Sequence, residues 1–164
     1  MIELVLLDVD GTLTDGKIIY NQDLCESKVF NVKDGLGLVT WQKLGKKVAI
    51  ISGRNSPITE FRAKELGISC LYMGIENKKE IVLKLKKDFD LQSSQIACIG
   101  DDLNDLPMFA ECGLCFTPSD GNEWLQEYAD VVLKSKGGEG AVREMIEYIL
   151  IEYGLKDEVL KIYQ

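Results

Sequence analysis

The sequence predicts an α/β protein: a Rossmann-like, doubly wound parallel sheet with a β-hairpin flap and no cap domain. Two observations lead to this prediction. Short apolar runs of strand length alternate with longer segments of helical periodicity along most of the chain, which is typical of a parallel sheet covered by helices on both faces. One interruption, soon after the first strand, has the pattern of two short strands around a polar turn.

The expected elements follow in a regular order. Strands are expected at Leu4–Leu7, Val48–Ile51, Cys70–Tyr72, Ile96–Ile99, Leu114–Phe116 and Val131–Leu133. Helices are expected at Leu36–Leu44, Ile58–Leu66, Lys78–Lys87, Leu103–Glu111, Trp124–Tyr128 and Ala141–Tyr153. The runs Lys17–Tyr20 and Ser27–Phe30 flank a polar stretch and predict a projecting hairpin over about residues 17–30.

Length and composition favour one ordinary compact domain over residues 1–164, ending in a short charged tail after Tyr153. No apolar run approaches the roughly 18 residues of a membrane span, and no signal peptide is visible at the start, so we expect a cytoplasmic protein. A net charge of −8 disfavours nucleic acid or an anionic membrane as partner. An anionic substrate would therefore need a local positive site.

The chain contains no histidine, which excludes Ser-His-Asp and Cys-His catalysis and most catalytic zinc sites. Acid–base chemistry is left to carboxylates, lysines, tyrosines or water. The five cysteines suit a reduced environment. Cys112 and Cys115 match C-x-x-C, but without further zinc ligands, and between a helix end and a strand, they are interpreted as packing residues.

The first candidate site follows the first strand. Asp8 and Asp10 are two positions apart, so in an extended segment they point the same way, and Gly11 then lets the backbone turn. Burying two facing carboxylates is costly unless a cation compensates their charge. The alternative is a solvated acidic turn.

Three further stretches also stand where an element ends or begins. Ser52-Gly53-Arg54 offers a hydroxyl and backbone N–H groups for a phosphate oxygen, although Ser52 could instead cap the helix that contains Pro57. Asp101, Asp102 and Asp105 exceed what helix capping requires, which is the alternative for them. Lys78 or Lys79 opens a helix, where the dipole disfavours a cation; a solvated surface lysine is the alternative.

These stretches gain meaning together, because loops at the carboxyl ends of parallel strands converge on one crevice. Clustered carboxylates beside a lysine and a hydroxyl indicate a magnesium site that can receive a phosphoryl group. The residues so brought together are Asp8, Asp10, Ser52, one of the two lysines, Asp101 and Asp105.

The order Asp-x-Asp-Gly-Thr, Ser-Gly-Arg, Lys and Gly-Asp-Asp-x-x-Asp resembles the haloacid dehalogenase superfamily of phosphohydrolases. The resemblance implies that Asp8 is the nucleophile that forms an aspartyl-phosphate and that Asp10 is the general acid and base. It implies that Ser52 binds the phosphoryl oxygens and that Lys78 neutralises Asp8 and the transferring group. The magnesium shell would consist of Asp8, the backbone carbonyl of Asp10 and Asp101, with Asp105 supporting it.

Spacing and further motifs narrow the resemblance. Between Asp10 and Ser52, and between Ser52 and Lys78, the chain is too short for a cap domain. The segments Thr14–Gly16, Phe30–Gly37 and Gly137–Glu144 resemble the capless 3-deoxy-D-manno-octulosonate 8-phosphate (KDO 8-phosphate) phosphatases. This branch implies a homotetramer in which a neighbour's hairpin caps the site, and a product used for the inner core of lipopolysaccharide.

A sister branch acts on nine-carbon sugar-acid phosphates and tends to carry an acid at the position of Arg54. Arg54 therefore favours the eight-carbon substrate, whose carboxylate it would bind beside Gly53. A non-catalytic assembly domain is disfavoured because both Asp8 and Asp10 are present. A response-regulator receiver is disfavoured because its adjacent acid pair would follow the first strand, whereas here Asp101 and Asp102 come late in the chain. A phosphomutase is disfavoured because it would usually carry a cap.

Overall fold

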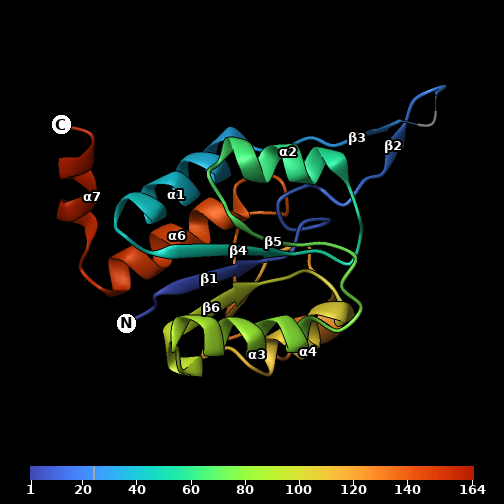
Figure 1. Ribbon diagram of the computed structural model, residues 1–164. Helices are drawn as coiled ribbons and strands as arrows, with labels where there is room; N and C mark the ends of the chain where they lie inside the picture. The colour runs from blue at the N-terminus through green and yellow to red at the C-terminus, as the bar shows by residue number, and fades with distance from the viewer. Residues whose placement is uncertain (24) are drawn as a thin grey trace.

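The computed structural model describes residues 1–23 and 25–164 and is built around a six-stranded parallel sheet (Figure 1). The strand order is β5-β4-β1-β6-β7-β8, and every neighbouring pair is parallel. The strands are β1 Leu4–Leu7, β4 Lys47–Ile51, β5 Cys70–Tyr72, β6 Ile96–Ile99, β7 Leu114–Thr117 and β8 Val131–Val132. From the central strand β1, the sheet grows on one side through β4 and β5 and on the other side through β6, β7 and β8. This reversal of direction is that of a doubly wound sheet, so the predicted class is confirmed.

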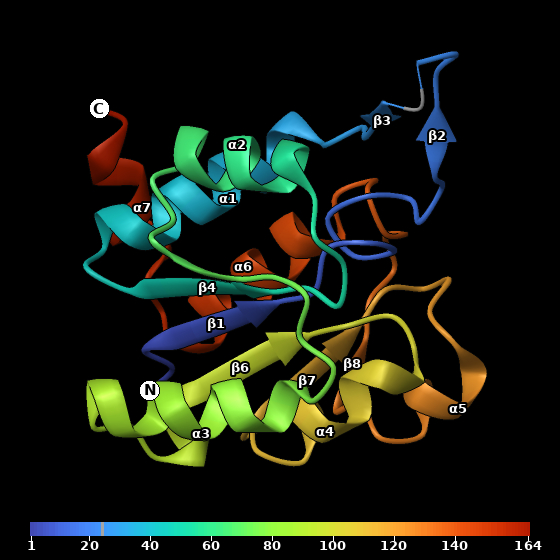
Figure 2. The same ribbon diagram turned by 45° about the vertical axis from the view of Figure 1, so that its right-hand side comes forward.

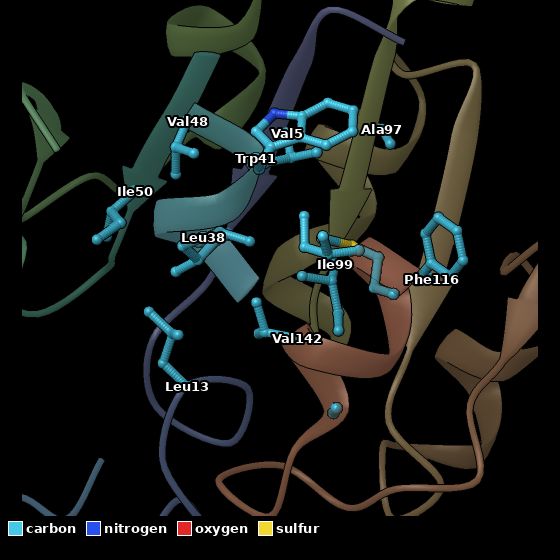
Figure 3. Close-up of a cluster of buried hydrophobic side chains, with 14 of the residues drawn as sticks. Val5, Leu13, Leu38, Trp41, Val48, Ile50, Ala97, Ile99, Phe116 and Val142 are labelled. Atoms are coloured by element: carbon cyan, nitrogen blue, oxygen red, sulfur yellow. The ribbon is translucent and has the colours of Figure 1, made fainter. Parts of the chain in front are cut away.

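Helices cover both faces of the sheet (Figures 1 and 2). One face carries α1 Val32–Lys43, α2 Pro57–Glu65 and α6 Ala141–Glu152, and the other carries α3 Lys78–Phe89, α4 Leu106–Phe109 and α5 Glu123–Gln126. Alternate residues of β1, β4 and β6 therefore enter different cores. Figure 3 shows the first core, where Trp41 and Leu38 of α1 pack near Val5 of β1. Leu6 of β1 faces the second core with Leu85 of α3.

The hairpin consists of β2 Ile19–Tyr20 and β3 Glu26–Ser27, which pair antiparallel and project from the body of the protein (Figure 1). Both strands are shorter than expected, and the second begins one residue earlier than predicted. Leu24, inside the predicted hairpin, lies outside the described residues.

No cap domain is inserted in the described part of the chain. Between β1 and β4 it holds the hairpin and α1, and between β4 and α3 it holds α2 and β5. In the same described residues, no helix is long and apolar enough to cross a membrane.

Beyond the hairpin, three predicted elements differ from the structure in kind or by more than two residues. Helix α1 begins at Val32, before the predicted Leu36, because the Asn31 side chain caps it by accepting from Lys33 N at 2.8 Å. The helix expected over Leu103–Glu111 is a 3₁₀ turn, Leu103–Asp105, followed by the short α4.

The C-terminal segment is the third difference, since it is not a plain charged tail. Lys156–Ile162 forms the helix α7, and the Tyr163 hydroxyl lies 2.6 Å from Thr40 Oγ1 of α1. The apolar residues Leu155 and Val159 also pack against the first core. This contact joins residues 123 positions apart, so local sequence pattern did not reveal it.

Candidate active site

The candidate site lies at the carboxyl edge of the sheet, where the strand arrows of Figure 2 end. Asp8 follows β1 directly, Ser52 follows β4 directly, and Asp101 comes two residues after β6. Lys78 is the first residue of α3, and Asp105 ends the 3₁₀ turn before α4. The predicted residues are therefore brought to one edge by the parallel topology.

Asp8, Lys78 and Asp105 form the centre of the site. Lys78 Nζ donates to Asp8 Oδ1 at 2.5 Å and to Asp105 Oδ1 at 2.6 Å. All three residues are buried, and the Lys78 side chain is only 1% exposed. Lys79 is instead 47% exposed and pairs with Glu111 at 2.7 Å. Of the two lysines left open by the sequence, Lys78 is the one in the site.

The carboxylates carry more negative charge than Lys78 neutralises. Burial, with repulsion from Asp105, raises the pKa of Asp8 to about 6 in the metal-free site, although Lys78 opposes the rise. Burial and repulsion from Asp8 and Asp105 raise the pKa of Asp101 to about 8. Burial would lower the pKa of Lys78, but Asp8 and Asp105 outweigh it and raise that pKa.

This imbalance fits a divalent cation. One carboxylate oxygen each of Asp8, Asp101 and Asp105 lies within 4.8 Å of the others, and magnesium takes oxygen ligands of this kind. The Asp10 carboxylate is not in this group among the described residues. A role for the Asp10 backbone carbonyl in the metal shell stays a prediction.

Asp105 organises the loop that carries Asp101. Its Oδ2 accepts from Asp101 N at 2.9 Å, and together with Asp102 it forms a capping box at the 3₁₀ turn. Asp102 Oδ1 accepts from Leu103 N at 2.7 Å. The capping interpretation therefore holds for Asp102 and Asp105, whereas the Asp101 carboxylate is left for the metal group.

Two glycines allow the loops to approach one another. Gly11 has φ +98°, and a Cβ there would lie 2.0 Å from Asp101 Oδ2. A Cβ at Gly137 would lie 1.8 Å from the Gly11 carbonyl oxygen. The Gly137-Gly138 segment thus packs against the backbone of residues 11–15, which directly follows Asp8 and Asp10, so this late motif lies beside the site.

Ser52 is buried, and its Oγ accepts from Arg54 N at 3.2 Å. The N-cap of α2 is Ser56, not Ser52, so the capping alternative for Ser52 is wrong. Gly53 is exposed beside it. The Ser52 hydroxyl lies at the end of β4, next to β1, where a phosphoryl oxygen would be expected.

Asp10 faces residues of the hairpin that sequence reasoning missed. Lys28 Nζ donates to Asp10 Oδ1 and lies 3.4 Å from Glu26 Oε1. Arg54 Nη2 donates to the same Glu26 oxygen at 2.6 Å, and Ser56 Oγ donates to Glu26 Oε2 at 2.8 Å. Glu26 and Lys28 are two positions apart and so share one side of an extended arm. That spacing was the available signal, but it did not say which side faces the protein.

Comparisons with known proteins agree with this geometry. A family model for haloacid dehalogenase-like hydrolases matches residues 37–113. The 3-deoxy-D-manno-octulosonate 8-phosphate phosphatase of Haemophilus influenzae is 40% identical over 153 residues, covering 93% of this chain and 85% of the relative. The enzyme of the same name from Escherichia coli K12 is 39% identical over 157 residues, covering 96% of this chain and 84% of the relative.

Solved structures point the same way. The Moraxella catarrhalis 3-deoxy-D-manno-octulosonate 8-phosphate phosphatase, in complex with magnesium, phosphate and KDO, is 41% identical with a TM-score of 0.95, covering 99% of this chain and 94% of that one. The Yersinia pestis enzyme is 40% identical with a TM-score of 0.92, covering 94% and 83%. The chain therefore belongs to the haloacid dehalogenase-like hydrolases and, within them, to the family of 3-deoxy-D-manno-octulosonate 8-phosphate phosphatases.

Proposed function

We propose that this protein is a magnesium-dependent phosphatase that hydrolyses KDO 8-phosphate to KDO and inorganic phosphate. The observation that supports this most is the buried contact of Asp8 with Lys78 beside the carboxylates of Asp101 and Asp105. The Moraxella relative, at 41% identity, was solved with magnesium, phosphate and KDO. The reaction would supply KDO for the inner core of lipopolysaccharide.

In the first step, an Asp8 oxygen attacks the substrate phosphorus, and the bond from phosphorus to the sugar oxygen breaks. Asp10 gives its proton to the departing sugar oxygen, which leaves KDO and an aspartyl-phosphate on Asp8. Lys78 and the Ser52 hydroxyl hold the phosphoryl oxygens. Magnesium, when held by Asp8 and Asp101 with Asp105 supporting the loop that carries Asp101, would supply positive charge to the transferring group.

In the second step, water attacks the phosphorus of the aspartyl-phosphate and gives a proton to Asp10. Phosphate leaves, Asp8 is again a carboxylate, and Asp10 is again protonated. A fixed Asp10 is needed in both steps, because the same side chain must reach the sugar oxygen first and the water afterwards.

Substrate choice would depend on Arg54, with Gly53 leaving room for the sugar. Arg54 is held by Glu26 at 2.6 Å, with its Nε 3.9 Å from Asp10 Oδ2. A guanidinium in this place can bind the substrate's carboxylate with two hydrogen bonds. The alternative substrate is a nine-carbon sugar-acid 9-phosphate.

We propose a cytoplasmic homotetramer of single-domain subunits, residues 1–164. The hairpin carries exposed Ile18, Ile19, Tyr20 and Val29, more apolar surface than a lone two-stranded ribbon holds in water. A neighbour's hairpin would wall the open site. Light scattering after size exclusion tests this, because a monomer of 18.4 kDa would contradict it.

The function itself is tested by phosphate release from a panel of sugar-acid phosphates with purified protein and magnesium. KDO 8-phosphate should have the highest kcat/KM, and Asp8→Asn should abolish turnover because an amide is a poor nucleophile. Asp15→Asn is the matched control: Asp15 lies in the same loop but, among the described residues, its carboxylate pairs with exposed Lys17 alone. A preference for a nine-carbon substrate would overturn the substrate, and an Asp8→Asn variant with about a tenth of the activity would overturn the covalent mechanism.

A further inference from the structure

We propose that Lys28 is a positioning residue for Asp10: the chain's own hairpin arm holds the acid–base carboxylate in its working orientation. This inference rests on the proposed function, in which Asp10 transfers the proton. It gives the hairpin a second task that acts within one subunit, separate from any cover that a neighbour supplies.

Asp10 is one of four side chains of alternating charge that form a closed ring. Lys28 Nζ donates to Asp10 Oδ1 and lies 3.4 Å from Glu26 Oε1. Glu26 Oε1 accepts from Arg54 Nη2 at 2.6 Å, and Arg54 Nε lies 3.9 Å from Asp10 Oδ2. Two members of the ring come from the hairpin arm and two from the loops after β1 and β4.

Lys28 is not an ordinary surface lysine. Its side chain is 1% exposed, whereas Lys17, at the other arm of the same hairpin, is 76% exposed. A buried ammonium is costly unless it is paired and hydrogen-bonded. The hairpin tip is otherwise exposed, with Tyr20 and Val29 open to solvent. The Lys28 ammonium is therefore a buried charge in an otherwise exposed hairpin, and Asp10 is its hydrogen-bonded partner.

Glu26 fixes the hairpin arm to the segment that follows β4. It contacts Arg54 and accepts from Ser56 Oγ at 2.8 Å, while lying next to Lys28. Burial alone would raise the pKa of Glu26, but the Ser56 hydrogen bond and the charges of Lys28 and Arg54 hold it below its ordinary value. Glu26 is thus an anion that joins the arm to the segment after β4.

The contact decides how the Asp10 carboxylate is turned. Lys28 occupies Oδ1, while Arg54 is beyond hydrogen-bond distance from Oδ2. Oδ2 is therefore the oxygen that can exchange a proton with the sugar oxygen or the water. Without Lys28 the carboxylate would rotate toward Arg54, and misplacement of a catalytic group by about 1 Å can cost about a hundredfold in rate.

The test compares Lys28→Met with Lys28→Arg and with the control Lys17→Met, using KDO 8-phosphate. We expect Lys28→Met to lower kcat by roughly tenfold to a hundredfold while KM changes by less than about twofold. Lys28→Arg should recover part of the lost kcat because it retains the charge. Lys17→Met should equal the parent. Circular dichroism and the magnesium-dependent thermal shift report whether each variant folds.

A double-mutant cycle separates this role from simple support of the fold. If Lys28 acts through Asp10, Lys28→Met should cost no further kcat when added to Asp10→Asn. Additive losses, or a rise in KM with kcat unchanged, would overturn the proposal. If Asp10→Asn itself leaves turnover intact, the acid–base assignment fails. If Asp10→Asn lowers kcat but Lys28→Met leaves it unchanged, only the inference about Lys28 fails.

Mixing subunits tests whether the hairpin arm acts within its own chain. Asp8→Asn chains keep Lys28, and Lys28→Met chains keep Asp8. Because the arm serves its own site, mixed and reassembled protein should show only the mean of the two activities. Activity well above that mean would place Lys28 in a neighbour's site and overturn the proposal.

Discussion

Lys78 and Asp8 are 70 positions apart in the chain, yet Lys78 Nζ donates to Asp8 Oδ1 across 2.5 Å in a buried site. The lysine begins α3, where the helix dipole disfavours a cation. The two carboxylates that it contacts, Asp8 and Asp105, compensate for that placement. Its charge thus serves the site rather than the helix.

Replacing Lys78 with methionine should abolish most of the activity and destabilise the metal-free protein. Removing one partner of a buried ion pair costs about 3–5 kcal/mol of unfolding free energy, because the remaining charge is left uncompensated. Denaturant unfolding in chelator measures this cost. Lys79→Met is the matched control, since Lys79 is half-exposed and pairs with Glu111 outside the site. Equal losses in both variants would contradict the assignment of Lys78.

The metal-free protein should lose stability as the pH rises from about 4 to about 8. Asp8 and Asp101 have folded pKa values of about 6 and about 8, above the ordinary value of 3.8. Between these values the folded state binds more protons than the unfolded state, so the slope of unfolding free energy against pH is negative. This contribution is fully present below the ordinary pKa and is lost as the pH passes through the folded values.

Thermal unfolding in chelator at pH 5.5 and at pH 8.5, about three pH units apart, measures this dependence. Magnesium competes with the same protons, so its stabilising effect should be larger at the higher pH. Asp101→Asn removes the group with the largest rise and should flatten the curve. The linkage would be refuted if the metal-free parent and the metal-free Asp101→Asn variant both gained stability with rising pH by the same amount.

Calcium should support turnover poorly, whereas chelation should silence the enzyme and added magnesium should restore it. The carboxylate oxygens of Asp8, Asp101 and Asp105 lie within 4.8 Å of one another. Magnesium needs only one or two carboxylates and keeps several waters, whereas calcium takes up to eight oxygens at longer distances, so this small group favours magnesium. Phosphate release in chelator, and after addition of each ion, checks this. Full activity in excess chelator is the result that would exclude a metal.

Tyr163→Phe should reduce stability without affecting turnover. The variant loses the hydroxyl contact with Thr40 Oγ1, but Thr40 still donates to Leu36 O at 2.7 Å. We expect a loss of about 0.5–1.5 kcal/mol in denaturant unfolding. Tyr128→Phe is the control, because Tyr128 is exposed beyond α5. A fall in kcat for Tyr163→Phe at unchanged stability would show that α7 acts on the site.

Residue spacing predicted the sheet, its helices and the acidic centre. Asp8, Lys78, Asp101 and Asp105 each stand at a strand end or a helix start, which local pattern detects. Parallel topology then places all such ends at one edge. The roles of Lys28 and Glu26 were not predicted, because both residues lie in a hairpin arm. There, period-two spacing does not tell which face of the arm packs against the body of the protein.

The sequence by itself determined the class of fold, the lack of room for a cap and the residues that we propose for a phosphate and metal site, because these depend on periodicity and on spacing along the chain. Only the tertiary structure decided between Lys78 and Lys79, turned Asp10 toward Lys28, and docked α7 on Thr40. Each of these is a contact between distant segments. Such contacts depend on how the elements pack, which neighbouring residues do not encode.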